Sequence, residues 1–291
     1  MPVAEGPAAE GITMLEAEGT SRRLISTRHG HVHVRSNGEG EPPLVLLHMG
    51  LSSGRMYRHI TPRLSAGRRV IVPDRLGFGC SDHPRPGLSL GDYADTTIDA
   101  LDAMGIGEFD VAGVHTGSCE AIDLAVRYPD RIRRIAVVTV PVFSPEEIPQ
   151  YKDNYLHEPK PDADGTHLDW YWRWWRDGGF GGAAERSRAW SPELLHEFLM
   201  DHLGAQPDPW MTYHAVFDHP TGEFVSKIRQ PFLVVDVHDD LTTQTARAMP
   251  LLPAHTRVVS RPDLTDVLEL FTTAADEIAD YFEEFFEEVL P

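Results

Sequence analysis

Apolar and polar residues follow two patterns along this chain, and each pattern predicts one type of secondary structure. Short, continuous apolar runs between turn residues are typical of strands that are buried on both faces of a parallel sheet. Such runs, with one alternating segment at the start, predict strands at residues 31–35, 44–48, 69–73, 109–114, 132–140, 232–237 and 257–260. Apolar residues at helical spacing predict helices at residues 92–104 and 119–127, and a final helix with Ile278, Phe282 and Phe285 on one face.

Strands and helices alternate along most of the chain, which predicts an α/β fold with a mostly parallel, twisted sheet and helices on both faces. The segment 142–228 breaks this alternation, because it holds all six tryptophans and is rich in Gly, Pro and Asp. We expect it to form a helical lid inserted between two strands of a core made by residues 23–141 and 229–291. Residues 1–22 are expected to form a flexible leader, because residues 1–20 are small, acidic and poor in aromatics. This stretch lacks a basic region followed by an apolar run, so it is not expected to be a secretory signal.

Charge and cysteine content limit the classes of partner. The formal net charge is −19 at pH 7, which argues against nucleic acid and anionic membranes, because both are bound through basic patches. No apolar run approaches the ~20 residues that a membrane-spanning helix needs. Two cysteines, Cys80 and Cys119, do not make a disulfide framework, so we expect a cytoplasmic protein. The expected partner is a small-molecule or peptide substrate; the edge strands are not defined sharply enough to predict an oligomeric state.

Three segments carry motifs that point to a known family. The first reads Leu-Leu-His-Met-Gly at residues 46–50 and leads to Ser52 and Ser53, the second reads Pro-Asp-Arg-Leu-Gly-Phe-Gly-Cys-Ser-Asp at residues 73–82, and the third reads Gly-Val-His-Thr-Gly at residues 113–117. In this order they resemble segments of the α/β-hydrolase superfamily, especially its lid-bearing, haloperoxidase-like branch. The first resembles the oxyanion loop and the third the nucleophile elbow. The resemblance runs from about residue 30 to the C-terminus, weakly through the lid, and it implies an α/β-hydrolase fold.

The elbow of this family holds its central residue on a strained turn between a strand and a helix, and small residues flank it so that strand and helix can approach closely. Gly113 and Gly117 meet this requirement, and the central residue is His115 rather than Ser, Cys or Asp. The family commonly ends the following helix with a Tyr-Pro pair, and Pro129 supports this register. In the alternative register Cys119 would be the nucleophile, with Glu120 inside the packed turn.

The other two positions of the family's catalytic triad can also be located. Asp240, or alternatively Asp239, matches the acid that follows the strand at residues 232–237. Asp266 falls where the family carries its catalytic histidine, and no histidine occurs after His255. Because an activated serine needs an imidazole to carry its proton, the triad is degenerate and ordinary serine-ester hydrolysis is not expected.

We interpret His115, Asp240 and Asp266 as the catalytic residues of a cofactor-free acid/base enzyme. An imidazole titrates near neutral pH, and a nearby carboxylate fixes its tautomer and raises its pKa. The backbone amides of Gly50 and Thr116 are expected to form the oxyanion hole. Such a site suits epimerisation, isomerisation, elimination or cyclisation, and the superfamily includes triad-less enzymes that tailor natural products, a peptide epimerase among them.

Three alternatives stay open. A pseudo-hydrolase would use the lidded pocket to bind a ligand without chemistry. A residual hydrolase would use His115 as a nucleophile or as a base for water. A metal site built from the histidine and the two aspartates has suitable ligand types, but no spacing in the sequence supports it, so we expect neither a metal nor another cofactor.

The residues expected to bind substrate are Met49, Trp170, Trp174 and Trp175. Trp170 and Trp174 share a helical face, so at least one pair of lid tryptophans is expected to pack internally. Tryptophans that face the pocket would, together with Asp240 and Asp266, favour a bulky substrate that is partly cationic or rich in amides.

Overall fold

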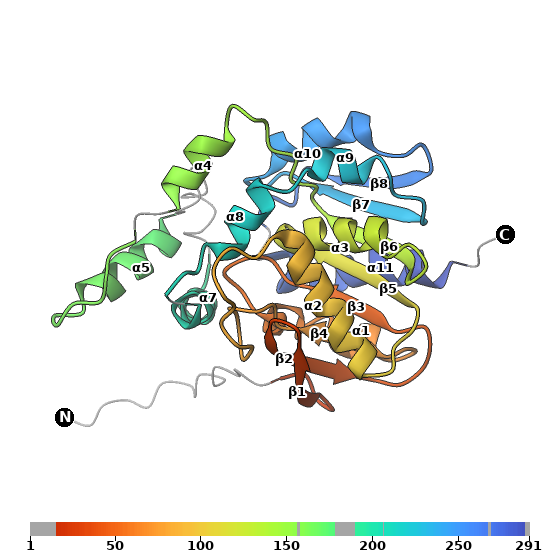
Figure 1. The fold of residues 1–291 in the computed structure, drawn as a ribbon, viewed down its shortest axis with the longest axis horizontal. Coiled ribbons are helices and arrows are strands. Elements are labelled where there is room, and N and C mark those ends of the chain that lie inside the picture. Colours follow the sequence, from red (N-terminus) through yellow and green to blue (C-terminus); the bar gives the residue numbers. More distant parts are fainter. Residues whose placement is uncertain (1–15, 156–157, 178–189, 206, 267–268, 289–291) are drawn as a thin grey trace, which may run out of the picture.

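A single eight-stranded sheet organises the computed structural model, which describes residues 16–155, 158–177, 190–205, 207–266 and 269–288 (Figure 1). The strand order is β1-β2-β4-β3-β5-β6-β7-β8. The pairs β1–β2 and β2–β4 are antiparallel and the remaining pairs are parallel. The predicted fold class is therefore confirmed. No helix in the described ranges combines the length and the apolar character needed to cross a membrane.

The strands match the predicted apolar runs closely, with one strand added. They are β1 Ser21–Thr27, β2 Gly30–Asn37, β3 Leu44–Leu47, β4 Val70–Pro73, β5 Phe109–Val114, β6 Ile132–Val138, β7 Phe232–Val237 and β8 Thr256–Arg261. β1 was not predicted, because it is a largely exposed edge strand with few apolar residues. It also places residues 21 and 22 of the expected leader in the sheet. β6 ends two residues before the predicted end, because Thr139 has a positive φ of 64°.

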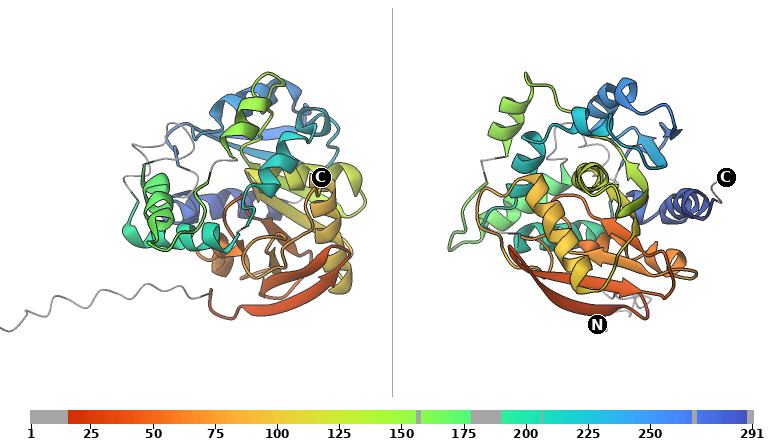
Figure 2. Two further views of the ribbon diagram at one scale, coloured as in Figure 1. Left: turned by 60° about the vertical axis from the view of Figure 1, so that its left-hand side comes forward. Right: turned by 45° about the vertical axis from the view of Figure 1, so that its right-hand side comes forward.

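Helices cover both faces of the sheet. They are α1 Thr61–Leu64, α2 Leu90–Ala103, α3 Thr116–Arg127, α4 Ile148–Asn154, α5 Thr166–Arg176, α7 Pro192–Gly204, α8 Met211–Phe217, α9 Thr221–Val225, α10 Thr242–Ala248 and α11 Ala275–Glu287, with short 3-10 turns at Gly54–Tyr57, Met249–Leu251 and Glu269–Phe271. Figure 2 shows α2 and α3 on one side of the sheet and α11 on the other. Two separate apolar clusters fill these two interfaces.

The described residues between β6 and β7 form helices joined by loops, as the composition of the segment predicts. α4, α5 and α7 lie beside the sheet rather than against either face (Figures 1 and 2), whereas α8 and α9 contact α3. The division into a core and a lid at residues 142 and 228 stays a prediction. Residues 1–15 of the expected leader lie outside the described residues.

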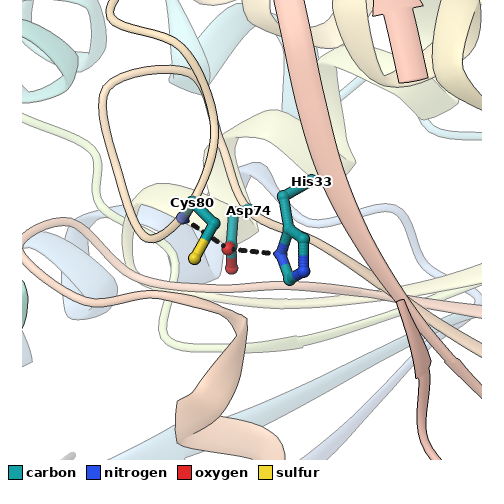
Figure 3. A group of neighbouring side chains, drawn as sticks. All are labelled: His33, Asp74 and Cys80. Carbon is teal, nitrogen blue, oxygen red and sulfur yellow. Dashed lines mark hydrogen bonds and ion pairs between the residues drawn. The ribbon is translucent and has the colours of Figure 1, made fainter. Parts of the chain in front are cut away.

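A buried carboxylate ties β2 and β4 to the loop that follows β4. Asp74 accepts hydrogen bonds from His33 Nδ1 at 2.8 Å and from the amide of Cys80 at 3.0 Å (Figure 3). It also accepts from Arg35 Nη1 at 2.5 Å and from the amide of Gly54 at 2.8 Å. Burial opposes ionisation of Asp74, but these hydrogen bonds and the Arg35 charge hold the pKa of its carboxyl group below the usual value. We assign Asp74 a structural role on these contacts.

Candidate active site

His115 occupies the bend between β5 and α3, with φ of 50° and ψ of −112°. A positive φ is strained for a residue with a side chain, and the surrounding structure must hold it in place. The flanking glycines show how tight the bend is. A Cβ atom on Gly117 would lie 2.0 Å from the carbonyl oxygen of Leu47, and a Cβ atom on Gly113 would lie 2.1 Å from the carbonyl oxygen of Gly117.

Cys119, the nucleophile of the alternative register, is placed inside α3 and not at the bend. Its side chain is fully buried, and its sulfur lies 3.7 Å from the hydroxyl group of Thr221. Burial raises the pKa of the thiol to about 12. Because the thiolate is the reactive form of cysteine, Cys119 has neither the position nor the ionisation of a nucleophile.

The imidazole of His115 is held by a carboxylate from the loop after β7. His115 Nε2 lies 2.7 Å from Oδ2 of Asp239, and Oδ1 of Asp239 accepts the backbone amide hydrogen of Leu241 at 2.8 Å. An ionised carboxylate only accepts hydrogen bonds, so Nε2 carries a hydrogen atom, and in the neutral imidazole Nδ1 keeps its lone pair. Within the described part of the chain, Nδ1 makes no hydrogen bond.

This contact corrects the expected acid partner, which was Asp240. The structure assigns the hydrogen bond to Asp239, the alternative, because the Leu241 amide anchors one oxygen of Asp239 and leaves the other for His115. Asp240 lines the same cavity, and its carboxylate lies within 4.8 Å of the His115 and Asp239 ligand atoms. Asp266 also lines the cavity and accepts a hydrogen bond from the indole nitrogen of Trp190.

Three carboxylates set the charge state of His115. Burial by itself would lower the pKa of the imidazole, but the charge and hydrogen bond of Asp239, with the charges of Asp240 and Asp266, raise the pKa of His115 above its ordinary value. The protonated form is therefore stabilised inside a largely apolar cavity.

The loop at residues 46–50 differs from the expectation that the backbone amides of Gly50 and Thr116 are both free to form an oxyanion hole. The backbone N–H of Gly50 donates to the hydroxyl oxygen of Thr116 at 3.2 Å. This contact leaves the Thr116 O–H as a donor, and Thr116 lines the cavity. Tyr213 covers the loop, since a Cβ atom on Gly50 would lie 2.3 Å from its ring. Burial raises the pKa of Tyr213 well above its ordinary value, so its phenol stays protonated and can donate.

His48 is a structural part of the same loop. Its Nδ1 lies 2.6 Å from the carbonyl oxygen of Met49, and its Nε2 accepts the amide hydrogen of Arg75 at 2.9 Å. Burial, with the nearby charge of Arg75, lowers the pKa of His48 to about 3. The imidazole is therefore neutral, with both of its nitrogens in contacts, and His115 is the histidine among the described residues that line the cavity.

The cavity beside His115 is walled mainly by aromatic rings. Its aromatic residues are Phe143, Tyr151, Tyr155, Trp175, Trp190, Tyr213 and Phe217. Among the expected substrate-binding residues, Met49 and Trp175 line it, whereas Trp170 and Trp174 line a separate surface hollow on α5. Trp170 and Trp174 stack on each other with ring centroids 6.3 Å apart. The tyrosines and Trp190 were not predicted as substrate-binding residues, because their only signal in the sequence is the aromatic richness of the segment 142–228.

Among the residues that the structure describes, two groups of side chains have the spacing of metal ligands. One is His115 with Asp239 and Asp240, and the other is His33 with Asp74 and Cys80 (Figure 3). The second group already has positive partners, because Arg35 contacts Asp74, and Arg22 Nε donates to His33 Nε2 at 3.0 Å. A metal ion there would be placed beside two guanidinium groups, so this group is better explained as an ion-pair network.

The strand order, the bend after β5 and the cavity above it define an α/β-hydrolase fold. The model of the family described as "alpha/beta hydrolase fold" matches residues 42–207, and the chain belongs to this family.

Two curated relatives are similar over part of the chain. One is 2-hydroxymuconate semialdehyde hydrolase from Pseudomonas sp. (strain CF600), with 36% identity over 100 residues, which are 33% of this chain and 35% of that protein. Another is cis-3-alkyl-4-alkyloxetan-2-one decarboxylase from Shewanella oneidensis, with 30% identity over 126 residues, which are 42% of this chain and 39% of that protein. The chain thus spans well under half the length of either relative.

A solved structure is similar over nearly the whole chain. The enol-lactonase from Burkholderia xenovorans LB400 has a TM-score of 0.73 at 20% identity and covers 91% of this chain and 100% of that chain. At this level of identity the likeness shows the fold alone.

Proposed function

We propose that this protein is an α/β-hydrolase-fold enzyme that performs cofactor-free acid/base chemistry on a small-molecule or peptide substrate, with His115 as the proton carrier. The observation that carries the proposal is the geometry of His115. Its Nε2 is bound to Asp239 at 2.7 Å, which leaves Nδ1 as the basic nitrogen of an imidazole that lines the aromatic cavity. A base within reach of a bound carbon acid is the minimum that such chemistry needs.

The residues around His115 support removal of a proton from a carbon next to a carbonyl group. Nδ1 takes the proton, the electrons of the broken C–H bond form an enolate, and Asp239 stabilises the imidazolium. The hydroxyl group of Thr116 and the neutral phenol of Tyr213 are donors for the enolate oxygen. Return of the proton gives an epimer or an isomer, and expulsion of a leaving group gives an elimination product. No covalent acyl intermediate is required.

A second candidate is hydrolysis with His115 as the base for water. It is favoured by several relatives that carry the names of hydrolases, among them 2-hydroxymuconate semialdehyde hydrolase and 2-hydroxy-6-oxo-2,4-heptadienoate hydrolase. A reaction other than hydrolysis also occurs among the relatives, since one is named a decarboxylase. Both candidates use the same base, and they differ in whether water enters the product.

Isotope labelling separates the two candidates. A panel of amino-acid amides with aromatic side chains is incubated with the protein in D2O, and a second set in water enriched in ¹⁸O. The proposal expects deuterium at the carbon next to the carbonyl, read by NMR, and epimerised product, read by chiral chromatography. Incorporation of ¹⁸O into a released acid without deuterium exchange would instead support hydrolysis.

The control for this experiment is a second histidine. His115→Ala should abolish exchange, whereas His238→Ala should not, because His238 is exposed and lies outside the residues that line the cavity. If panel members bind but neither isotope is incorporated by the wild-type protein, the proposal is wrong and a role in ligand binding without chemistry takes its place.

A further inference from the structure

A buried histidine in the segment between β6 and β7 contacts Trp175, which lines the cavity. Trp175 Nε1 donates to Nδ1 of His202 at 3.1 Å, and Nε2 of His202 lies 2.7 Å from Oε1 of Glu158. The other oxygen of Glu158 accepts a hydrogen bond from the hydroxyl group of Tyr171 at 2.8 Å. His202 on α7 therefore links α5, which carries Trp175 and Tyr171, to the residues before α5.

The types of atom fix the direction of both hydrogen bonds of His202. An indole nitrogen can only donate, so Nδ1 of His202 accepts from Trp175 and carries no hydrogen atom. The imidazole then carries its hydrogen atom on Nε2, and Glu158 accepts it. His202 is thus an acceptor toward Trp175 and a donor toward Glu158, and only one tautomer of the neutral ring makes both contacts.

Aromatic rings enclose the imidazole of His202, which has no exposed surface. The ring centroids lie 5.0 Å from the imidazole for Tyr171, 5.4 Å for Trp210, 5.7 Å for Trp174 and 5.9 Å for Trp175. Trp175 is buried as well. A buried donor that loses its acceptor costs free energy, because water does not reach it as a replacement. The position of the Trp175 indole is therefore coupled to the acceptor nitrogen of His202.

The helix that carries His202 is anchored to the loop after β3. Ser53 Oγ donates to Oδ2 of Asp201 at 2.9 Å, and Arg55 forms an ion pair with the same carboxylate. Asp201 directly precedes His202 on α7. Consecutive side chains of a helix point about 100° apart, so α7 contacts this loop with one residue and holds Trp175 with the next.

We propose that His202, held in one tautomer by Glu158, is a positioning residue that keeps the indole of Trp175 as a fixed, flat part of the cavity wall for a planar apolar group of the substrate. His202 is not among the described residues that line the cavity, so it acts on the substrate through Trp175. Aromatic rings gain from stacking or edge-to-face contact only in certain orientations, so a fixed ring selects a planar partner. The inference rests on the proposed function only in taking this cavity as the substrate site.

Two probes with the same amide group test the preference for a planar group. They are benzamide, whose ring is flat, and cyclohexanecarboxamide, whose six-membered ring is not. Affinities are measured by NMR titration and by quenching of tryptophan fluorescence, because Trp175 lines the cavity. We expect the wild-type protein to bind benzamide about threefold or more tightly than cyclohexanecarboxamide. Equal binding of the two probes would overturn the inference.

Two variants of His202 separate its hydrogen bonds. His202→Asn places an oxygen near the position of Nδ1 and keeps an acceptor for Trp175, so it should keep the preference for benzamide. His202→Gln places a nitrogen near the position of Nε2, keeps a donor for Glu158 and loses that acceptor, so it should lose most of the preference. His196→Gln is the matched control, because His196 is exposed on the same helix and lies outside the described lining of the cavity. If His202→Gln keeps the preference, or if His196→Gln loses it equally, the inference is wrong.

The contact is also testable without any substitution. Long-range ¹H–¹⁵N NMR of the wild-type protein reads the tautomer of each histidine. His202 should carry hydrogen at Nε2 and none at Nδ1, and the indole N–H of Trp175 should exchange slowly with D2O. Hydrogen at Nδ1 of His202 is incompatible with an acceptor for Trp175 and would overturn the inference even if the variants fail to fold.

Kinetics separate this inference from the proposed function. For aromatic amides that show deuterium exchange, His202→Gln should raise KM about threefold or more and leave kcat within about twofold of the wild type, because a wall contact is made equally before and in the transition state. A fall in kcat at unchanged KM would overturn the positioning role. His115→Ala should lose exchange and keep the preference for benzamide, and unchanged exchange in this variant refutes only the proposed function.

Discussion

Replacing Asp239 with asparagine tests the central contact of the site with almost no change in shape. The carboxylate accepts the Nε2 hydrogen of His115 at 2.7 Å. An asparagine amide in the same place can donate its own hydrogen to Nε2 instead. The hydrogen of the neutral imidazole then moves to Nδ1, and Nδ1 is no longer a base.

The expected size of the effect follows from the role of the base. Positioned general acid/base groups contribute ~10²–10⁴-fold to rate, so Asp239→Asn should lower kcat for deuterium exchange by about 100-fold or more. The variant also removes the largest cause that raises the pKa of His115. The limb of the pH–rate profile that reports His115 should therefore shift to lower pH.

The assay compares three variants by exchange rate and by circular dichroism. Asp236→Asn serves as the folding control, because Asp236 lies on β7 and outside the lining of the cavity. If Asp239→Asn keeps its exchange rate while Asp240→Asn loses it, then Asp240 is the acid partner in solution and the reasoning from the 2.7 Å contact is refuted.

Three other results are expected. Because the pKa of His115 is raised on folding, its ion pair with Asp239 should stabilise the protein fully below the unfolded pKa of ~6.5. This contribution should be lost as pH rises through the raised pKa. The difference in unfolding free energy between wild type and His115→Gln, measured by urea titration, should therefore shrink with rising pH. His115→Gly should be more stable than His115→Ala by about 1 kcal/mol in the same assay, because glycine relieves the φ of 50°; equal stability would show that the bend is not strained. Gly117→Ala should fail to fold or lose ~3 kcal/mol or more, because its Cβ atom would lie 2.0 Å from backbone, and a wild-type melting temperature would contradict the tight elbow.

The sequence was sufficient for the parts of this protein that a local pattern specifies. The apolar runs located seven of the eight strands, and they missed β1 because an exposed edge strand does not need the pattern of a buried one. The bend at His115 could be predicted, because Gly113 and Gly117 and their spacing leave few ways to pack a strand against a helix. The start of α3 was predicted three residues late, since Gly117 hides the helical pattern of its first turn.

The acid partner of His115 and the residues of the cavity wall could not be predicted from a local pattern. Asp239 and Asp240 are consecutive in a turn, and which of them meets His115 depends on contacts with Leu241 and on the path of the chain after β7. The tyrosines of the wall come from α4 and α8 and the residue after α4. Their position depends on how the segment between β6 and β7 packs over the sheet, which no motif in that segment records.

The arrangement at the elbow places two opposing electrostatic effects on one imidazole. His115 stands at the N-terminal end of α3, where the helix dipole disfavours a positive charge. The aspartates on the other side of the ring favour that charge, and they prevail, because the pKa of His115 is raised. In the proposed reaction, transfer of a proton to Nδ1 would create an imidazolium between Asp239 and an enolate that accepts from the Thr116 hydroxyl group and the Tyr213 phenol. The elbow that serves a nucleophile in other family members would here hold a proton carrier in the same strained position.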